Sequence, residues 1–205
     1  TPWYEADVGI VGDRITRVGN LPGATAPQVI DATGLIVAPG FIDPHTHALR
    51  GIFDVPNAES ALLQGVTTLT EGNDGSSPYP IDRHYADIQD LRISPNWAVF
   101  VGQGTIRQRV IGFGLRKASP QEMDRMKQMV RDAMEQGALG ISTGLFYVPG
   151  SFTSTEEVIE LSKVAAEYNG IYISHIREEA AQLIDSVQET IRIGEEAGIP
   201  VQITH

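Results

Sequence analysis

Four of the five histidines in this 205-residue chain lie at the downstream end of a short apolar, β-type run. They are His45, His47, His175 and His205. Alternate side chains of an extended segment share a face, so His45 and His47 would point to the same side. Neutral imidazole is the side chain that most often binds metals. The spacing of His45 and His47 is weak evidence alone, but the shared position of all four histidines predicts a common metal site.

From residue 39 onward, short apolar runs alternate with stretches of helical periodicity. The expected β-type runs end near His45, Glu71, Gly102, Thr143, His175 and His205. Helices are expected over residues 119–137, 155–168 and about 178–197. Ser119 and Glu122 can form a capping box at the start of the first helix, and residues 153–157 carry the cap of the second. In the last helix the residues expected to face inward are Ala181, Ile184, Val187, Ile191 and Gly194. His84 lies in a polar stretch and is interpreted as a solvated loop or helix residue.

Strands that alternate with helices predict a parallel α/β architecture. In a closed parallel barrel the carboxyl ends of the strands ring one mouth, where ligands from separate strands can converge. Six strands do not close an eight-stranded barrel. We therefore expect residues 39–205 to form about six of the eight strands of a (β/α)8 TIM-type barrel, truncated at the C-terminal end.

Residues 1–38 are expected to form part of a small β-sandwich domain with a structural role. Residues 6–11 and 14–19 flank a Gly12-Asp13 turn and predict a hairpin. Two further short β segments are expected at residues 29–31 and 35–38.

Composition limits the partners. A net charge of −11 without a basic cluster argues against nucleic acid and anionic membranes. No apolar run approaches the roughly 18 residues of a membrane span. The chain has no cysteine, which excludes disulfides, thiolate ligands and a cysteine nucleophile. A cytoplasmic location is the default expectation, and a periplasmic or secreted one stays open because Thr1 looks like mid-domain sequence.

Five stretches of the chain carry a family resemblance. They are residues 39–47 (PGFIDPHTH), 64–68 (QGVTT), 140–147 (GISTGLFY), 174–179 (SHIREE) and 201–205 (VQITH). Together they resemble the amidohydrolase superfamily, and within it the N-acyl-D-amino-acid deacylases, or D-aminoacylases. The His-x-His stretch is common to the superfamily. Residues 140–147 and the spacing from His175 to His205 are more typical of this branch.

The resemblance implies a metal centre. His45 and His47 correspond to ligands on the first strand, and His175 and His205 to ligands on the fifth and sixth. The implied cofactor is one or two divalent ions, with zinc first and manganese or cobalt as alternatives.

The chain departs from the family pattern at two positions. D-aminoacylases place a cysteine ligand in Gly-Asn-Cys-Gly after the second strand, and Asp74 stands at that position here. Glu71 is the alternative ligand, and Asp74 could instead make an Asx turn with Gly75. Gln103 stands where the family usually has histidine, and glutamine cannot titrate.

The resemblance also implies substrate contacts. Phe146 matches a position that lines the pocket for the substrate side chain, and Tyr147 follows it; core packing is the alternative for both. Arg177 could face a substrate carboxylate or pair with Glu178 or Glu179. Each of these assignments is an expectation that depends on the resemblance.

The implied reaction is hydrolysis of an N-acyl-D-amino acid to a carboxylate and a D-amino acid, through hydroxide activated by the metal. In the superfamily an aspartate at the end of the eighth strand moves the proton, and it would lie beyond His205. Residues 1–205 alone are therefore expected to be inactive without the C-terminal part of the barrel, as the same or a separate chain. The alternatives are a cyclic-amide hydrolase or D-specific dipeptidase of the same superfamily, or a metal-free, catalytically dead barrel used for binding.

Overall fold

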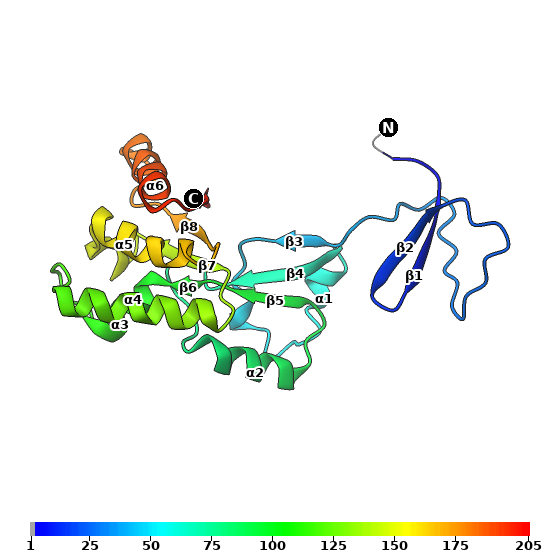
Figure 1. Cartoon of the computed structure of the whole chain (residues 1–205), viewed down its shortest axis with the longest axis horizontal. Coiled ribbons are helices and arrows are strands. Elements are labelled where there is room, and N and C mark those ends of the chain that lie inside the picture. The colour runs from blue at the N-terminus through cyan, green and yellow to red at the C-terminus, as the bar shows by residue number, and fades with distance from the viewer. Residues whose placement is uncertain (1–2) are drawn as a thin grey trace. The chain divides into compact units, whose positions relative to one another are not determined.

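The computed structural model describes residues 3–205 (Figure 1). The described chain forms two compact units, one ending at Pro39 and the other running from Gly40 to His205. No helix within these residues is both long and apolar enough to cross a membrane.

The first unit contains an antiparallel hairpin. Strands β1 (Asp7–Val11) and β2 (Arg14–Gly19) pair across a turn in which Gly12 has φ +62°, a conformation that glycine adopts without steric cost. The predicted hairpin is confirmed. The prediction of β segments at residues 29–31 and 35–38 is wrong, because neither stretch pairs with another strand among the described residues. Apolar, β-branched composition supplies propensity, but a strand also needs a neighbour for its backbone groups.

The second unit is built on parallel strands whose spatial order follows the chain. One sheet contains β3 (Phe41–Asp43), β4 (Val66–Glu71) and β5 (Asn96–Val99), and the next contains β6 (Val101–Gly102), β7 (Gly140–Gly144), β8 (Ile171–His175) and β9 (Val201–Ile203). Only Phe100 separates β5 from β6, and its N–H donates to the Glu71 carbonyl. The predicted parallel α/β architecture is confirmed.

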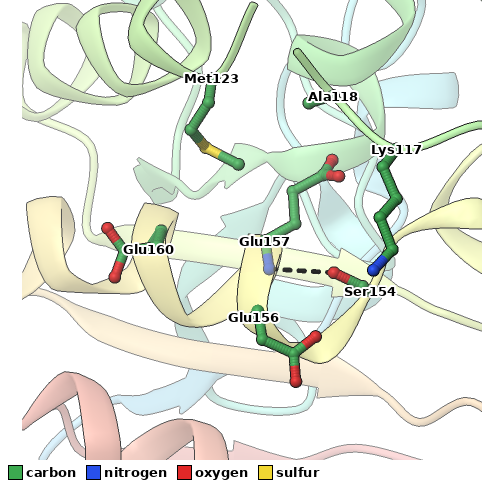
Figure 2. Close-up of a pocket in the computed structure, with 7 residues that line it drawn as sticks. All are labelled: Lys117, Ala118, Met123, Ser154, Glu156, Glu157 and Glu160. Carbon is green, nitrogen blue, oxygen red and sulfur yellow. Dashed lines mark hydrogen bonds between the residues drawn. The ribbon is translucent and has the colours of Figure 1, made fainter. Parts of the chain in front are cut away.

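Helices follow the strands. They are α1 (Glu59–Leu62), α2 (Ile81–Leu91), α3 (Gln103–Val110), α4 (Pro120–Glu135), α5 (Thr155–Ala166) and α6 (Leu183–Ala197), with short 3-10 helices η1 (Ala48–Arg50) and η2 (Gly150–Phe152). The predicted capping box of α4 forms between Ser119 and Glu122. Ser154 caps α5 by accepting the N–H of Glu157 (Figure 2). Sequence reasoning did not assign α2 and α3.

The core lies between β6–β9 and the later helices. Helix α4 packs on α5, and α5 on α6 (Figure 1). Val101 and Ile141 from the strands are fully buried in the same cluster as Met126, Leu161 and Ile193 from the helices. Burying each such side chain contributes about 1.5–3 kcal/mol, so this layer holds the strand ends in fixed positions.

Helix α6 differs from its prediction. It begins at Leu183 rather than 178, because the Glu178 carboxylate accepts the N–H groups of Ala180 and Gln182 and keeps that segment in a turn. Its buried residues are Ser186, Thr190, Ile193, Gly194 and Ala197. The inward placement of Ala181, Ile184 and Ile191 is wrong, since all three are exposed. A Cβ at Gly194 would lie 2.5 Å from Val201, so close approach to β9 selects this face.

Candidate metal centre

The segment after β3 turns His45 and His47 to one side. The Thr46 hydroxyl between them bonds the Thr70 carbonyl at 2.7 Å and Glu71 Oε1 at 2.9 Å. These two bonds direct the Thr46 side chain toward β4, so the rings of His45 and His47 point together away from that strand. Their Nε2 atoms lie 3.5 Å (His45) and 3.2 Å (His47) from Asp74 Oδ2. The prediction that the pair shares a side is confirmed.

Asp74 is held in place by close backbone packing. It has φ +54°, a left-handed conformation that aspartate tolerates better than most residues. A Cβ added at Gly72 would lie 2.1 Å from the Phe100 carbonyl oxygen, and one added at Gly144 would lie 2.2 Å from the Asp74 carbonyl oxygen. The loop therefore fits only with glycine at these positions. An unusual conformation that its surroundings impose in this way is typical of functional sites.

The Asp74 carboxylate faces the histidines. Its Oδ1 lies 3.7 Å from His175 Nδ1, while Oδ2 lies near His45 and His47. Among the described residues no hydrogen bond joins this carboxylate to its own loop, and Oδ1 is buried without a hydrogen-bond partner. The Asx-turn alternative is therefore wrong.

His175 and His205 complete the cluster. His175 is the last residue of β8, and His205 follows β9. The ring centroids of His175 and His205 are 4.7 Å apart, and those of His45 and His205 are 5.0 Å apart. One ligand atom each from His45, Asp74 and His205 all lie within 4.8 Å of one another. Residues from four separate segments thus meet at the carboxyl ends of the strands.

The cluster has the chemistry of a cation site. Both ring nitrogens of His45 and of His175 are buried without a hydrogen-bond partner among the described residues. Buried polar atoms are bonded in about 90% of cases or more, so these unpaired atoms need a partner. Burial lowers the pKa of His45, and the Asp74 charge opposes this only in part, so the ring favours its neutral, metal-binding form. Imidazole nitrogen and carboxylate oxygen together suit a divalent transition-metal ion.

Two glutamates lie next to the cluster. Glu71 Oε1 accepts the Thr46 hydroxyl and the Leu49 N–H, both at 2.9 Å, so this carboxylate positions the His45–His47 segment. Glu179 Oε2 lies 3.4 Å from His175 Nε2. Sequence reasoning considered Glu179 only as a partner for Arg177 and missed its contact with the histidine, because residues 176–179 form no helix or strand whose periodicity would indicate it.

The predicted substrate residues have different environments. Phe146 and Tyr147 are 48% and 46% exposed, which is inconsistent with core packing. Their ring centroids lie 5.6 and 4.7 Å from that of His175. Arg177 pairs with Glu189, at 2.7 and 2.9 Å, rather than with the glutamates that follow it in the chain. The contacts of Phe146, Tyr147 and Arg177 with a substrate remain predictions.

Gln103 is fully buried, and its amide nitrogen donates to Thr153 Oγ1 at 2.8 Å. This bond ties the start of α3 to the segment before α5. The amide nitrogen is therefore engaged in the scaffold, whereas Oε1 is buried without a hydrogen-bond partner among the described residues.

His84 is not a solvated residue, contrary to the prediction. It is 6% exposed on α2, and its Nε2 accepts the Trp97 indole N–H at 3.0 Å. Burial lowers its pKa. The reason is helical spacing: positions 81, 84 and 88 share the buried face of α2, so His84 lies between Ile81 and Ile88.

A cavity of about 650 Å³ opens beside the cluster. His47, Asp74 and Tyr147 line it, as do residues that sequence reasoning missed: Arg50, Ser76, Thr105 and Gln108. A smaller cavity of about 290 Å³ lies near the start of α5 and contains three glutamates (Figure 2). Lys127 and Lys163 pair with one of them, Glu160, and hold its pKa at about 2. None of the side chains that line the smaller cavity has a buried polar atom without a partner among the described residues, in contrast to the histidine cluster.

A parallel strand–helix unit with histidines at its strand ends and a carboxylate between them defines a class of α/β protein with a candidate metal centre, and the sequence comparison names the family. The chain belongs to the amidohydrolase family, whose profile matches residues 28–204. It is 39% identical over its whole length to a D-aminoacylase and 33% identical to an N-acyl-D-glutamate deacylase, both from Alcaligenes xylosoxydans xylosoxydans. The chain spans about half of these relatives, 47% and 46% of their lengths.

Solved structures agree with the sequence comparison. A D-aminoacylase crystal structure, described as defining a novel subset of amidohydrolases, superimposes with a TM-score of 0.89 at 36% identity, over 100% of this chain and 48% of that one. The N-acyl-D-glutamate deacylase of Bordetella bronchiseptica, in complex with zinc and a phosphonate inhibitor, gives a TM-score of 0.90 at 32% identity, over 96% of this chain and 46% of that one. Another D-aminoacylase structure, at a TM-score of 0.87, concerns a binuclear metal centre.

Proposed function

We propose that this chain supplies the metal-binding part of an amidohydrolase that deacylates N-acyl-D-amino acids, releasing a carboxylate and a D-amino acid. One observation carries the proposal: His45, His47, Asp74, His175 and His205 converge at the strand ends, with buried ligand atoms that lack partners. Relatives named as D-aminoacylase and N-acyl-D-glutamate deacylase supply the substrate class.

The four histidines and Asp74 would hold one or two divalent ions, zinc first. Asp74 faces three of the histidines with its two oxygens, so it could complete their ligand set. We favour it over Glu71, because Glu71 Oε1 is already bonded to Thr46 and Leu49. A divalent cation in such a site supplies Lewis-acid chemistry, activating water and polarising an amide carbonyl.

The remaining residues position the substrate. Phe146 and Tyr147 present exposed rings beside His175 and would contact the amino-acid side chain. Asp74 lies near Nδ1 of His175, and Glu179 lies near Nε2 of the same ring. Glu179 would orient that ring, as carboxylates beside metal-binding histidines commonly do. Arg177 tethers the loop after β8 to Glu189 and to the carbonyls of Ser151 and Thr153. Any contact of Arg177 with substrate would be made from this tethered position.

We further propose that the strands of the second unit belong to a (β/α)8 barrel of which six strands lie in this chain, with β5 and β6, which only Phe100 separates, counted as one. The neighbour order follows the sequence, and every pairing within the second unit is parallel, as in such a barrel. The first unit would contribute to a small β domain through its hairpin.

The deciding experiment measures metal content and turnover on the complete enzyme. We expect about one or two zinc ions per chain and hydrolysis of N-acetyl-D-amino acids, with little activity on the L-enantiomers. A stoichiometry below a few tenths of an ion would favour a metal-free binding module. A preference for cyclic amides or D-dipeptides would replace the deacylase assignment with another chemistry of the same superfamily.

The inactivity of residues 1–205 alone stays a prediction. It is checked by assaying that polypeptide after zinc loading. Turnover by this polypeptide without any other segment would contradict it.

A further inference from the structure

The cavity beside the histidine cluster contains a cationic side chain that the proposed function does not use. Arg50 lines this cavity together with His47, and it is the one lysine or arginine among the lining residues. Its side chain is exposed to solvent, and within residues 3–205 it makes no hydrogen bond or ion pair. A cation in this position favours an anionic ligand.

Local geometry places Arg50 next to the candidate metal centre. His47 precedes the 3-10 helix η1, and the Arg50 N–H donates to the His47 carbonyl at 3.2 Å. Side chains at i and i+3 of a 3-10 helix are eclipsed, with a rise of about 6 Å over the three residues. Arg50 and His47 therefore lie on the same face of η1, and both face the cavity.

The acidic groups of the cavity are already engaged. Glu71 Oε1 accepts from Thr46 and Leu49, and Asp74 faces the histidines. The other polar lining residues include the neutral Ser76, Thr105 and Gln108. The guanidinium donors therefore face solvent and are available to a ligand, and the planar fork matches the two oxygens of a carboxylate.

We propose that Arg50 binds a carboxylate of the substrate and so selects N-acyl amino acids over neutral amides. This inference rests on the proposed deacylase function. The carboxylate has two possible sources. One is the α-carboxylate, two bonds from the amide nitrogen, and the other is the side-chain carboxylate of an acidic amino acid.

Kinetics of Arg50→Gln in the complete, metal-loaded enzyme distinguish the two sources. The substrates are N-acetyl-D-leucine, N-acetyl-D-leucinamide, N-acetyl-D-glutamate and N-acetyl-D-glutamine. Loss of a charge-assisted bond should lower kcat/KM by roughly 10- to 100-fold. Recognition of the α-carboxylate gives this loss on every substrate except the leucinamide, whereas recognition of the side chain gives it on the glutamate alone. Arg50→Lys keeps the charge and should recover part of the loss.

The matched control is Arg125→Gln, since Arg125 is an exposed arginine on α4 that does not line the cavity. It makes the same change in charge and should leave kcat/KM unchanged. An equal loss on all four substrates, the leucinamide included, would overturn the role of Arg50 in carboxylate binding. Unchanged kinetics in Arg50→Gln would overturn it as well, while wild-type turnover would leave the deacylase function standing.

A binding measurement tests the proposed carboxylate contact of Arg50 without requiring turnover. Calorimetry measures the Kd of N-acetyl-D-glutamate for the metal-free enzyme, in the wild type and in both variants. A Kd raised about 10-fold or more in Arg50→Gln alone supports the proposal, even if the wild type hydrolyses no N-acyl-D-amino acid and the deacylase function fails. Equal Kd values, or no binding to the wild type, overturn it.

Discussion

Two buried polar clusters in the second unit differ in how completely their atoms are paired. Arg107 and Glu157 are 0% and 4% exposed and form a 2.5 Å ion pair. The other terminal nitrogen of Arg107 bonds the carbonyls of Gly114 and Arg116, and among the described residues only the Nε atom of this cluster lacks a partner. In the histidine cluster, by contrast, the ring nitrogens of His45 and His175 have no hydrogen-bond partner within residues 3–205. The first cluster stabilises the chain as it stands. The second has the unpaired atoms that a ligand would satisfy.

The largest effect on folding should come from breaking the paired cluster. Arg107→Met leaves the Glu157 carboxylate buried without its partner and should lower the free energy of unfolding by about 3–5 kcal/mol. Denaturant titration of the metal-free protein measures this. The control is Arg131→Met, which breaks the exposed 3.8 Å pair with Glu167 and should cost about 1 kcal/mol or less. Equal losses would remove the distinction between the buried pair and a surface pair.

Metal should stabilise the unpaired cluster. Zinc added to the stripped protein at 100 times its Kd should raise the free energy of unfolding by about 2.7 kcal/mol, if it binds only the folded state. Thermal unfolding with and without zinc measures the gain. His45→Phe should abolish most of it, whereas Arg125→Gln should preserve it. A gain that persists in full in His45→Phe would place the metal elsewhere.

The same substitution should cost little when metal is absent. His45→Phe replaces a ring with two unpaired buried nitrogens by an apolar ring, so we expect the free energy of unfolding of stripped protein to change by about 1 kcal/mol or less. Denaturant titration checks this. A loss as large as that of Arg107→Met would mean that His45 supports the fold rather than a ligand.

The smallest effect concerns pH and His84. Burial lowers the pKa of this histidine in the folded state from its ordinary value of 6.5. Between these two pKa values the unfolded chain therefore binds the proton more readily than the folded chain does. Stability should therefore fall as the pH drops through about 6.5 toward the folded pKa, where protonation also removes the acceptor of the Trp97 bond. Thermal unfolding between pH 7.5 and 5.5 should show a smaller decrease in His84→Asn than in the wild type. The same decrease in both proteins would exclude His84 as a contributor.

Sequence reasoning succeeded where local signals act alone. The capping box of α4 and the N-cap of α5 predicted those helix starts, and Gly12 predicted the hairpin turn. Predictions from the sequence were wrong where long-range contacts determine the structure. Residues 35–38 have strand propensity but no partner, and Ile191 fits an apolar stripe that the contact between Gly194 and β9 rotates outward.

Residue types, spacing and the alternation of strands and helices determined by themselves the parallel architecture and which four histidines lie together. Histidines at the ends of parallel strands must meet at one edge of the sheet, so their order along the chain was sufficient. Only the tertiary structure decided that Asp74 faces these histidines, that Arg177 pairs with Glu189, that His84 is buried and that Arg50 shares the cavity. The physical reason is that the partner of a side chain depends on distances and burial in the folded chain. The local sequence does not encode these long-range distances.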